Sequence, residues 1–341
     1  MESRPLKAVT TRLRKFPGRS TKDGFQKEPL QASPALPAGF EPFWAKTRAE
    51  LEDIPLDVCH EPFQTKDLAL LFERLTFSSL GGVRISGYTL WWKDDVERPL
   101  VVHGHGYGGG FEVMWHWAER GVNVLGVEVR GYGRSKEALS ARSQWGYVLT
   151  GIESPKGHVL RGAVCDYMRA AEVGRELLGS HTSRTVLTGV SFAGGLAVMA
   201  EAVLGAADLL AVAVPSLGWV EGRRFLASKG SGGEVNRYLK EHPEREGDLM
   251  DVLRYFDPMN FAPRVRCPTL VGIGLADDVV PAPTVYAIAD HLGGPHEVVT
   301  WPASHADLPE EDFFEERFEA YWLRLAMEGI PASFGAVPRS P

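Results

Sequence analysis

The 341-residue sequence predicts an α/β protein built on a mainly parallel, twisted sheet of about eight strands, with helices on both faces. Short runs rich in β-branched residues alternate with longer segments of helical spacing. The hydrophobic fraction of 44% is sufficient for a full core. No apolar stretch approaches the roughly 18 residues that span a bilayer. This alternation indicates βαβ units and a parallel sheet covered on both faces.

The N-terminal part of the chain precedes the alternating pattern. Residues 1–37 are rich in Arg and Lys, with Pro, Ser and Thr, and lack the apolar region of a secretory signal. We expect a disordered basic lead-in here, although a transit peptide or a misassigned start codon would look similar. Helical spacing of Phe, Trp and Leu predicts a helix over 39–53, followed by a proline-containing loop. Residues 70–93 predict two strands joined at Gly81-Gly82, an antiparallel hairpin.

The alternating elements follow this hairpin. Strands are expected at 98–103, 122–129, 185–190, 209–214, 268–274 and 297–301. Helices are expected at 111–119, 161–178, 192–204, 284–292 and 312–327. Residues 218–260 break the alternation and predict a helical insertion over one end of the sheet, a position from which insertions often cover a site. The expected organisation is one domain over 38–330, with this insertion, and a tail at 331–341.

Charge and cysteine content argue against several classes of function. The net charge of −7 gives no reason to expect nucleic acid or an anionic membrane as a partner. The three cysteines are widely spaced and form no CxxC pair, so neither a disulfide framework nor a zinc site is predicted. We therefore expect a protein of the reducing cytoplasm, and no metal site is predicted.

The stretch RTVLTGVSFAGGLAVMA, residues 184–200, places Ser191 between an expected strand and an expected helix. In a small-x-Ser-x-small turn the strand and helix approach closely, which explains small residues at Gly189 and Ala193. The serine then projects from the carboxyl edge of the sheet, where α/β proteins bind ligands. The alternative is that Ser191 only caps the following helix, so a nucleophile needs partners to support it.

Those partners occur later in the chain. A serine nucleophile needs an imidazole base and an acid that orients the imidazole, and on this type of sheet they follow in the order Ser, acid, His. The segment PTLVGIGLADD ends with Asp277 and Asp278, and EVVTWPASHADL contains His305. Taken singly, the acids could be turn residues and the histidine a surface residue. Successive strand side chains face opposite ways, so one aspartate at most serves, and spacing does not say which.

The stabilisation of an oxyanion requires two backbone N–H donors. One would be Phe192, directly after the serine, and the other would lie in the glycine-rich turn VVHGHGYGGG, residues 101–110. His103 and His105 in this turn lack the Asp, Glu or Cys companions of a metal site, and the turn matches no phosphate-binding motif. RGYGRS, residues 130–135, is interpreted as a structural turn.

From about Phe40 to the last helix, the chain resembles the acetyl xylan esterase and cephalosporin-C deacetylase group, carbohydrate esterase family seven. The resemblance includes FWAKTRAE with IPLD, the HGY-GG segment, RGYGRS and YVLTGIESPKGHVLRGAVCDYMRAAE. It continues through YFDPMNFAPRVRCPTLVGIGLADDVVPAPTVYAIADHLGGPHEVVTWPASHAD. The resemblance implies an α/β-hydrolase fold and a cofactor-free serine esterase.

Carried over by position, the family pattern implies Ser191 as nucleophile, Asp277 as acid and His305 as base, with the N–H groups of Tyr107 and Phe192 as oxyanion donors. The substrate-binding residues that it implies are Tyr107, Phe192, Pro215 and Val279. The implied substrates are small acetyl esters, acetylated xylo-oligosaccharides and cephalosporin-type alcohols, and family members often form homo-oligomers. Two alternatives stay open: a prolyl-oligopeptidase-like serine peptidase and a catalytically inert hydrolase-fold binding protein.

Overall fold

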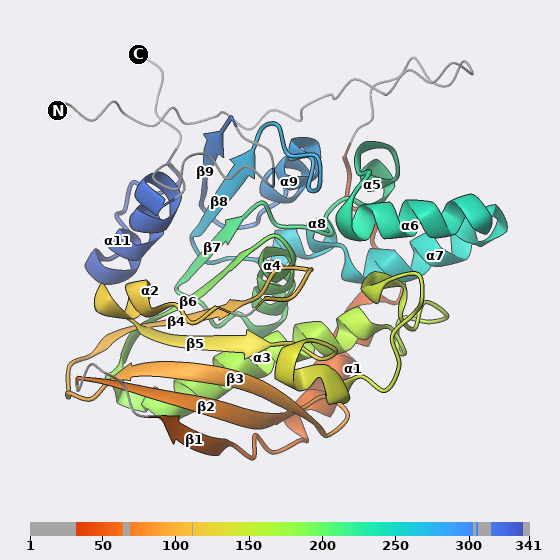
Figure 1. The fold of residues 1–341 in the computed structure, drawn as a ribbon. Coiled ribbons are helices and arrows are strands. Elements are labelled where there is room, and N and C mark those ends of the chain that lie inside the picture. Colours follow the sequence, from red (N-terminus) through yellow and green to blue (C-terminus); the bar gives the residue numbers. More distant parts are fainter. Residues whose placement is uncertain (1–31, 64–68, 111, 303–304, 306–314, 337–341) are drawn as a thin grey trace, which may run out of the picture.

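A twisted sheet of nine strands runs through the described part of the chain (Figure 1). The computed structural model describes residues 32–63, 69–110, 112–302, 305 and 315–336. The strands are β1 (Cys59–Phe63), β2 (Leu70–Ser79), β3 (Val83–Trp92), β4 (Arg98–Gly104), β5 (Asn123–Glu128), β6 (Thr182–Val190), β7 (Leu209–Ala213), β8 (Thr269–Gly274) and β9 (His296–Trp301). Residues 1–31 of the expected basic lead-in lie outside the described residues.

The strand order β1-β2-β3-β5-β4-β6-β7-β8-β9 confirms the predicted mainly parallel sheet. The first three pairings, β1–β2, β2–β3 and β3–β5, are antiparallel, and the pairings from β5 through β4 to β9 are parallel. Because β4 and β6 pair in parallel, their carboxyl ends lie at the same edge of the sheet. This α/β-hydrolase arrangement brings the ends of β6, β8 and β9 to the same side of the sheet.

Strand β1 is a ninth strand that the sequence analysis missed. Its residues, CHEPF, are exposed or half-buried and include Pro62, so they show no alternation of buried and exposed positions. Proline is tolerated here because β1 is an edge strand, whose outer backbone groups need no partner strand. Pairing with β2, from Cys59 opposite Thr76 to Phe63 opposite Phe72, defines the strand.

Helices cover both faces of the sheet, as the sequence predicted. They are α1 (Phe40–Glu52), α2 (Trp115–Glu119), α3 (Val159–Leu178), α4 (Phe192–Leu204), α5 (Val220–Leu226), α6 (Gly230–Glu241), α7 (Glu246–Leu253), α8 (Pro258–Phe261), α9 (Ala282–Ala289) and α11 (Ala320–Glu328), the last preceded by a π-helical turn at Glu315–Glu319. On one face α2 and α11 meet through Trp117 and Trp322, whose ring centroids are 5.0 Å apart. On the other face lie α3, α4 and α9 (Figure 1).

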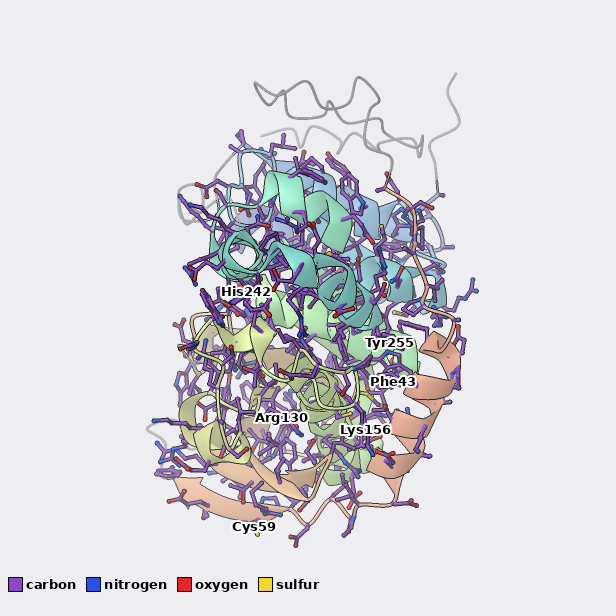
Figure 2. All side chains as sticks on the ribbon, turned by 90° about the vertical axis from the view of Figure 1, so that its right-hand side faces the viewer. Phe43, Cys59, Arg130, Lys156, His242 and Tyr255 are labelled. Atoms are coloured by element: carbon purple, nitrogen blue, oxygen red, sulfur yellow. The ribbon has the colours of Figure 1, made fainter. Side chains whose placement is uncertain are left out.

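Helix α1 is fastened to the rest of the molecule by aromatic side chains. Phe43 contacts Tyr255 at a centroid distance of 5.0 Å, and both lie on the side that Figure 2 shows. The indole of Trp44 donates a hydrogen bond of 3.0 Å to the Tyr255 carbonyl. These contacts join the N-terminal helix to the segment after α7. Helices α5 to α7 occupy most of the region where the sequence predicts a helical insertion.

Among the described helices, none combines the length and the apolar character required to cross a membrane.

Candidate active site

The turn between β6 and α4 holds Ser191 in a sparsely populated backbone conformation, with φ 56° and ψ −114°. Three backbone hydrogen bonds fix the residue. Its N–H donates to the Ala213 carbonyl at 2.9 Å, and its carbonyl accepts from Ser216 at 2.9 Å and from Gly195 at 3.1 Å. The Ser191 side chain makes no capping hydrogen bond to α4, so helix capping does not explain this serine.

Small neighbours allow this turn to form, as the sequence analysis argued. A Cβ on Gly189 would lie 2.6 Å from the carbonyl carbon of Ala193 and would clash with it. A Cβ on Gly104, at the end of β4, would lie 3.2 Å from the Ala193 Cβ. Strand β6, helix α4 and the end of β4 therefore approach too closely for larger side chains at these positions.

Asp277 and His305 are joined by a hydrogen bond between Oδ2 and Nδ1, 2.8 Å long. The Asp277 side chain is fully buried, and its other oxygen accepts from the N–H groups of Val279 at 2.9 Å and Val280 at 2.7 Å. An ionised carboxylate only accepts hydrogen bonds, so His305 Nδ1 carries the proton. His305 Nε2 is then left with a lone pair that can accept another proton.

The neighbouring acid, Asp278, points elsewhere. Its exposed carboxylate pairs with Lys229, which directly precedes α6. The loop after β8 thus directs one aspartate to the histidine and the next to solvent.

Ser191, Asp277 and His305 line one cavity of about 550 Å³ at the carboxyl edge of the sheet. Its other lining residues are Gly106, Tyr107, Gly108, Val190, Val214, Ser216, Gly230, Ser231, Val279, Val280 and Trp301. Of the four expected substrate-binding residues, Tyr107 and Val279 line this cavity. Phe192 and Pro215 are buried and are not among its lining residues.

Phe192 lies beneath the cavity in a group of rings. Its ring centroid is 5.4 Å from that of Tyr107, 5.7 Å from Tyr147 and 6.1 Å from Tyr132. As the first residue of α4, Phe192 has no acceptor for its N–H within the helix. The backbone donor is therefore set by the start of the helix, while the side chain is held by aromatic packing.

The side chain of Tyr107 is held by neighbours on two other segments. Its hydroxyl donates to Glu234 of α6 and accepts from the N–H of Val148 at 3.0 Å, and its carbonyl accepts from the Tyr132 hydroxyl at 2.8 Å. Burial raises the pKa of the Tyr107 hydroxyl well above its usual range, so this phenol stays protonated at neutral pH. Sequence reasoning identified Tyr107 and interpreted RGYGRS, which contains Tyr132, as a structural turn, but it gave Tyr132 no role at the site and missed Glu234, which lies in no motif.

The two histidines of the glycine-rich turn have structural partners. His103 contacts the Tyr88 hydroxyl at 2.6 Å, and burial lowers its pKa to about 4. His105 contacts the carbonyl of Gly106 at 2.8 Å, and burial lowers its pKa as well. Among the described residues, no group of three or more His, Cys, Asp or Glu side chains is placed to hold a metal ion.

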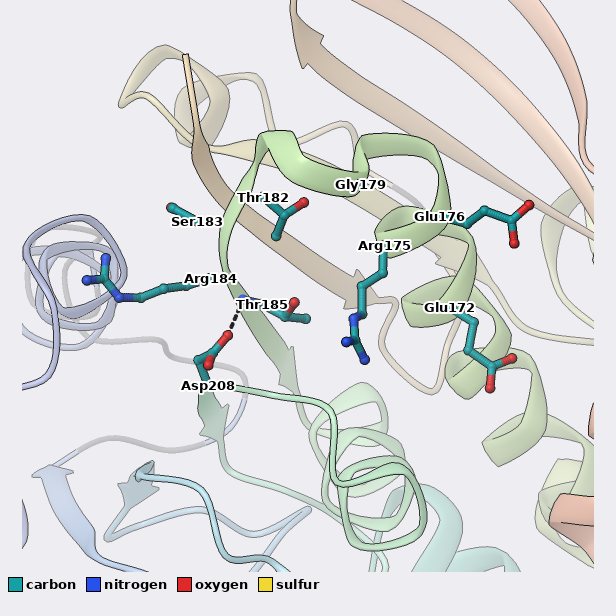
Figure 3. A pocket seen from close by; sticks show the side chains of 9 residues that line it. All are labelled: Glu172, Arg175, Glu176, Gly179, Thr182, Ser183, Arg184, Thr185 and Asp208. Atoms are coloured by element: carbon teal, nitrogen blue, oxygen red, sulfur yellow. Dashed lines mark hydrogen bonds between the residues drawn. The ribbon is translucent and has the colours of Figure 1, made fainter. Parts of the chain in front are cut away.

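A second cavity, of about 490 Å³, lies near the start of β6 and the end of α3 (Figure 3). Charged side chains such as Arg175 and Glu172 line it, and Asp208 accepts a hydrogen bond of 2.7 Å from the Thr185 N–H. Its nine lining residues include no histidine, so it offers serine chemistry no imidazole base. The cavity that contains Ser191 is therefore the candidate active site.

Comparisons with known proteins identify the family of the chain. A profile of the acetyl xylan esterase (AXE1) family matches residues 28–323. The acetyl esterase Axe7A of Xylanibacter ruminicola is 23% identical over 297 residues, which cover 82% of this chain. The same alignment covers 66% of that relative, slightly less than two thirds of its length.

Solved structures of similar proteins share the fold. An acetyl xylan esterase from Paenibacillus sp. R4 is 25% identical, with a TM-score of 0.77, covering 87% of this chain and 98% of that one. Acetyl xylan esterase 1 from Thermoanaerobacterium sp. JW/SL YS485 has a TM-score of 0.78 at 20% identity, covering 86% and 96%. The acylaminoacyl peptidase of Pyrococcus horikoshii has a TM-score of 0.55 at 15% identity, covering 83% of this chain but 44% of the peptidase.

Proposed function

Because this chain belongs to the acetyl xylan esterase (AXE1) family of the α/β-hydrolase superfamily, we propose that it is a serine esterase that removes acetyl groups from alcohols. Ser191 is the proposed nucleophile, His305 the base and Asp277 the acid. The observation that carries the proposal is the 2.8 Å hydrogen bond from His305 to Asp277 in a cavity that Ser191 also lines.

In the proposed first half-reaction, the Ser191 hydroxyl oxygen attacks the acetyl carbonyl carbon while its proton moves to His305 Nε2. The buried carboxylate of Asp277 keeps the other ring nitrogen protonated and offsets the positive charge of the imidazolium. Nε2 then gives its proton to the alcohol oxygen as the ester bond breaks. The products are the free alcohol and acetyl-Ser191.

In the second half-reaction, His305 takes a proton from water, whose oxygen attacks the acetyl-enzyme. Acetate leaves and the Ser191 hydroxyl is restored. In both steps the carbonyl oxygen becomes negatively charged, and the proposed donors to it are the N–H groups of Tyr107 and Phe192. An oxyanion donor of this kind is worth about 3 kcal/mol of transition-state stabilisation.

The proposed substrates are small acetyl esters, acetylated xylo-oligosaccharides and cephalosporin-type alcohols. The names of the relatives support the acetyl group and the xylan-type alcohol. Tyr107, which lines the cavity with Ser191 and is backed by the buried Phe192 ring 5.4 Å away, supports a proposed preference for a short acyl chain. We also propose a homo-oligomer, following the family resemblance, and light scattering would measure its mass.

Ser191→Ala tests the proposal directly. We expect loss of p-nitrophenyl acetate hydrolysis and of stoichiometric labelling by a fluorophosphonate, with the thermal unfolding midpoint retained. Ser183→Ala is the matched control, because Ser183 is an exposed serine near the opposite end of the same strand. Turnover by a folded Ser191→Ala protein would overturn the assignment. Faster cleavage of a prolyl amide than of an acetyl ester by the wild type would favour a peptidase.

A further inference from the structure

We propose that Glu234 is a positioning residue for the oxyanion loop, so that helix α6 sets the placement of the Tyr107 N–H. Glu234 is not among the residues that line the cavity. Any effect of Glu234 on the reaction rate would pass through its hydrogen bond with the Tyr107 side chain. The inference rests on the proposed function, because it concerns the oxyanion donor of that reaction.

The contacts of Tyr107 carry the first step of the argument. The loop around Gly106 and Gly108 contains little but glycine, so side chains of the loop itself offer few anchors. His105 and Tyr107 are the exceptions. The buried His105 packs on the Tyr132 ring at a centroid distance of 4.6 Å, and the Tyr107 hydroxyl is bound on one side to Glu234 and on the other to the Val148 N–H, 3.0 Å away. Removing the carboxylate would free the end of the side chain that fixes this loop.

The second step is the close packing around the Glu234 carboxylate. Gly146 has φ 135°, and a Cβ at that position would collide with the Glu234 carboxyl group. The loop before Val148 therefore approaches α6 at this carboxylate, with no room for a side chain between them. Displacement of Glu234 would disturb both partners of the Tyr107 hydroxyl together.

Burial and charge act on the Glu234 carboxyl group in opposite directions. Burial is the larger influence and raises its pKa, while the hydrogen bond from Tyr107 and the positive charges of Arg142 and Arg237 oppose this rise. Arg142 lies 5.4 Å from the ring centroid of Tyr132, the residue that donates to the Tyr107 carbonyl. Glu234 therefore lies among the cations and tyrosines that surround the glycine-rich turn.

The third step concerns the first turn of α6, just before Glu234. Gly230 and Ser231 at the start of α6 line the cavity, and the Ser231 hydroxyl accepts a hydrogen bond of 2.7 Å from Arg223. Glu234 follows on the next turn of the same helix. One rigid element therefore forms a wall of the cavity and holds Tyr107, which ties the position of the oxyanion donor to the wall that a substrate touches.

The experiment compares Glu234→Leu, Glu234→Gln and Tyr107→Phe in the full chain, with p-nitrophenyl acetate. Oxyanion contacts are made mainly in the transition state, so we expect Glu234→Leu to lower kcat about ten-fold or more with KM nearly unchanged. Glu234→Gln keeps an oxygen acceptor and should retain most of kcat. The double variant with Tyr107→Phe should be no slower than the slower single variant, because both changes break one interaction.

Glu241→Leu and Glu241→Gln are the matched controls, since Glu241 is an exposed acid at the end of the same helix. They should leave kcat unchanged. A folded Glu234→Leu protein with wild-type kcat, or an additive double variant, would overturn the inference. So would a loss of thermal stability alone, which is the result that a purely structural contact predicts. If Glu234→Leu fails to fold, Tyr107→Phe decides, because it removes the same hydrogen bond from the other partner: a folded Tyr107→Phe protein with wild-type kcat would overturn the inference.

The rate of Ser191 labelling by a fluorophosphonate separates this inference from the proposed function, because the phosphoryl oxygen uses the same donors. A wild-type chain that is labelled but hydrolyses no acetyl ester would contradict the substrate, and the labelling rates of the variants would still test Glu234. A wild-type chain that is neither labelled nor able to hydrolyse an acetyl ester would overturn both the proposed function and the inference about Glu234.

Discussion

Replacing Asp277 by Asn would test the proton arrangement of the site. The Asp277 carboxylate accepts two backbone N–H groups on Oδ1 and the His305 N–H on Oδ2. In Asp277→Asn the amide NH₂ must face either the two backbone donors or the imidazole. The first orientation loses two buried hydrogen bonds at about 1–3 kcal/mol each, or roughly 2–6 kcal/mol in total. The second orientation is therefore expected.

In that orientation the amide donates to His305 Nδ1, so the proton moves to Nε2 and the ring can no longer accept the serine proton. The same change in the Ser-His-Asp template lowers kcat by about 10⁴, or roughly 5.5 kcal/mol of activation free energy. We expect a loss of this size in p-nitrophenyl acetate hydrolysis, with the fold retained. Asp278→Asn is the control, because that exposed acid pairs with Lys229 and should leave kcat within about two-fold. An Asp277→Asn enzyme with more than about a tenth of wild-type kcat would refute the reasoning.

Three further changes test the supporting structure. Gly189→Ala puts a Cβ 2.6 Å from the Ala193 carbonyl carbon, so activity and the unfolding midpoint should both fall, and unchanged values would contradict the close approach. Asp166→Ala leaves the buried Arg130 guanidinium without its 2.7 Å partner and should cost about 3–5 kcal/mol in urea unfolding, whereas a loss below 1 kcal/mol would argue against a buried pair. Burial lowers the pKa of His158 from 6.5 to about 4, so its contribution to stability should be lost as pH falls from about 6.5 to 4. His158→Gln should flatten the dependence of unfolding free energy on pH over that range, and an unaltered slope would speak against it.

The order of the sheet and helices could be predicted because buried parallel strands and amphipathic helices have different periods along the chain. Strand β1 could not, since its exposed residues and Pro62 carry no such period and its pairing with β2 alone defines it. The start of α2 was also misplaced. We expected a helix from residue 111, and it begins at Trp115 and is five residues long.

The triad candidates could be predicted because chemistry fixes the residue types and their order along the chain. Strand alternation predicted that only one of the two adjacent aspartates serves, but both lie in the loop after β8, where that rule does not apply. The choice between them needed either a family pattern or the three hydrogen bonds that Asp277 receives. The hydrogen bonds that support the oxyanion loop could not be predicted. Tyr132 lies in the RGYGRS turn, but nothing in the sequence signals its contact with Tyr107, 25 positions away, and Glu234 lies 127 positions from Tyr107 in no motif.

The position of the proposed nucleophile depends on backbone that takes no part in the chemistry. A non-glycine residue with the φ and ψ of Ser191 costs about 1–3 kcal/mol. The three backbone bonds to Ala213, Ser216 and Gly195 are worth about 0.5–1.5 kcal/mol each, which is enough to offset that strain. Two of them come from the end of β7 and the loop after it, outside the serine motif. The motif supplies the small residues that permit the turn, and the neighbouring strand supplies the bonds that maintain it.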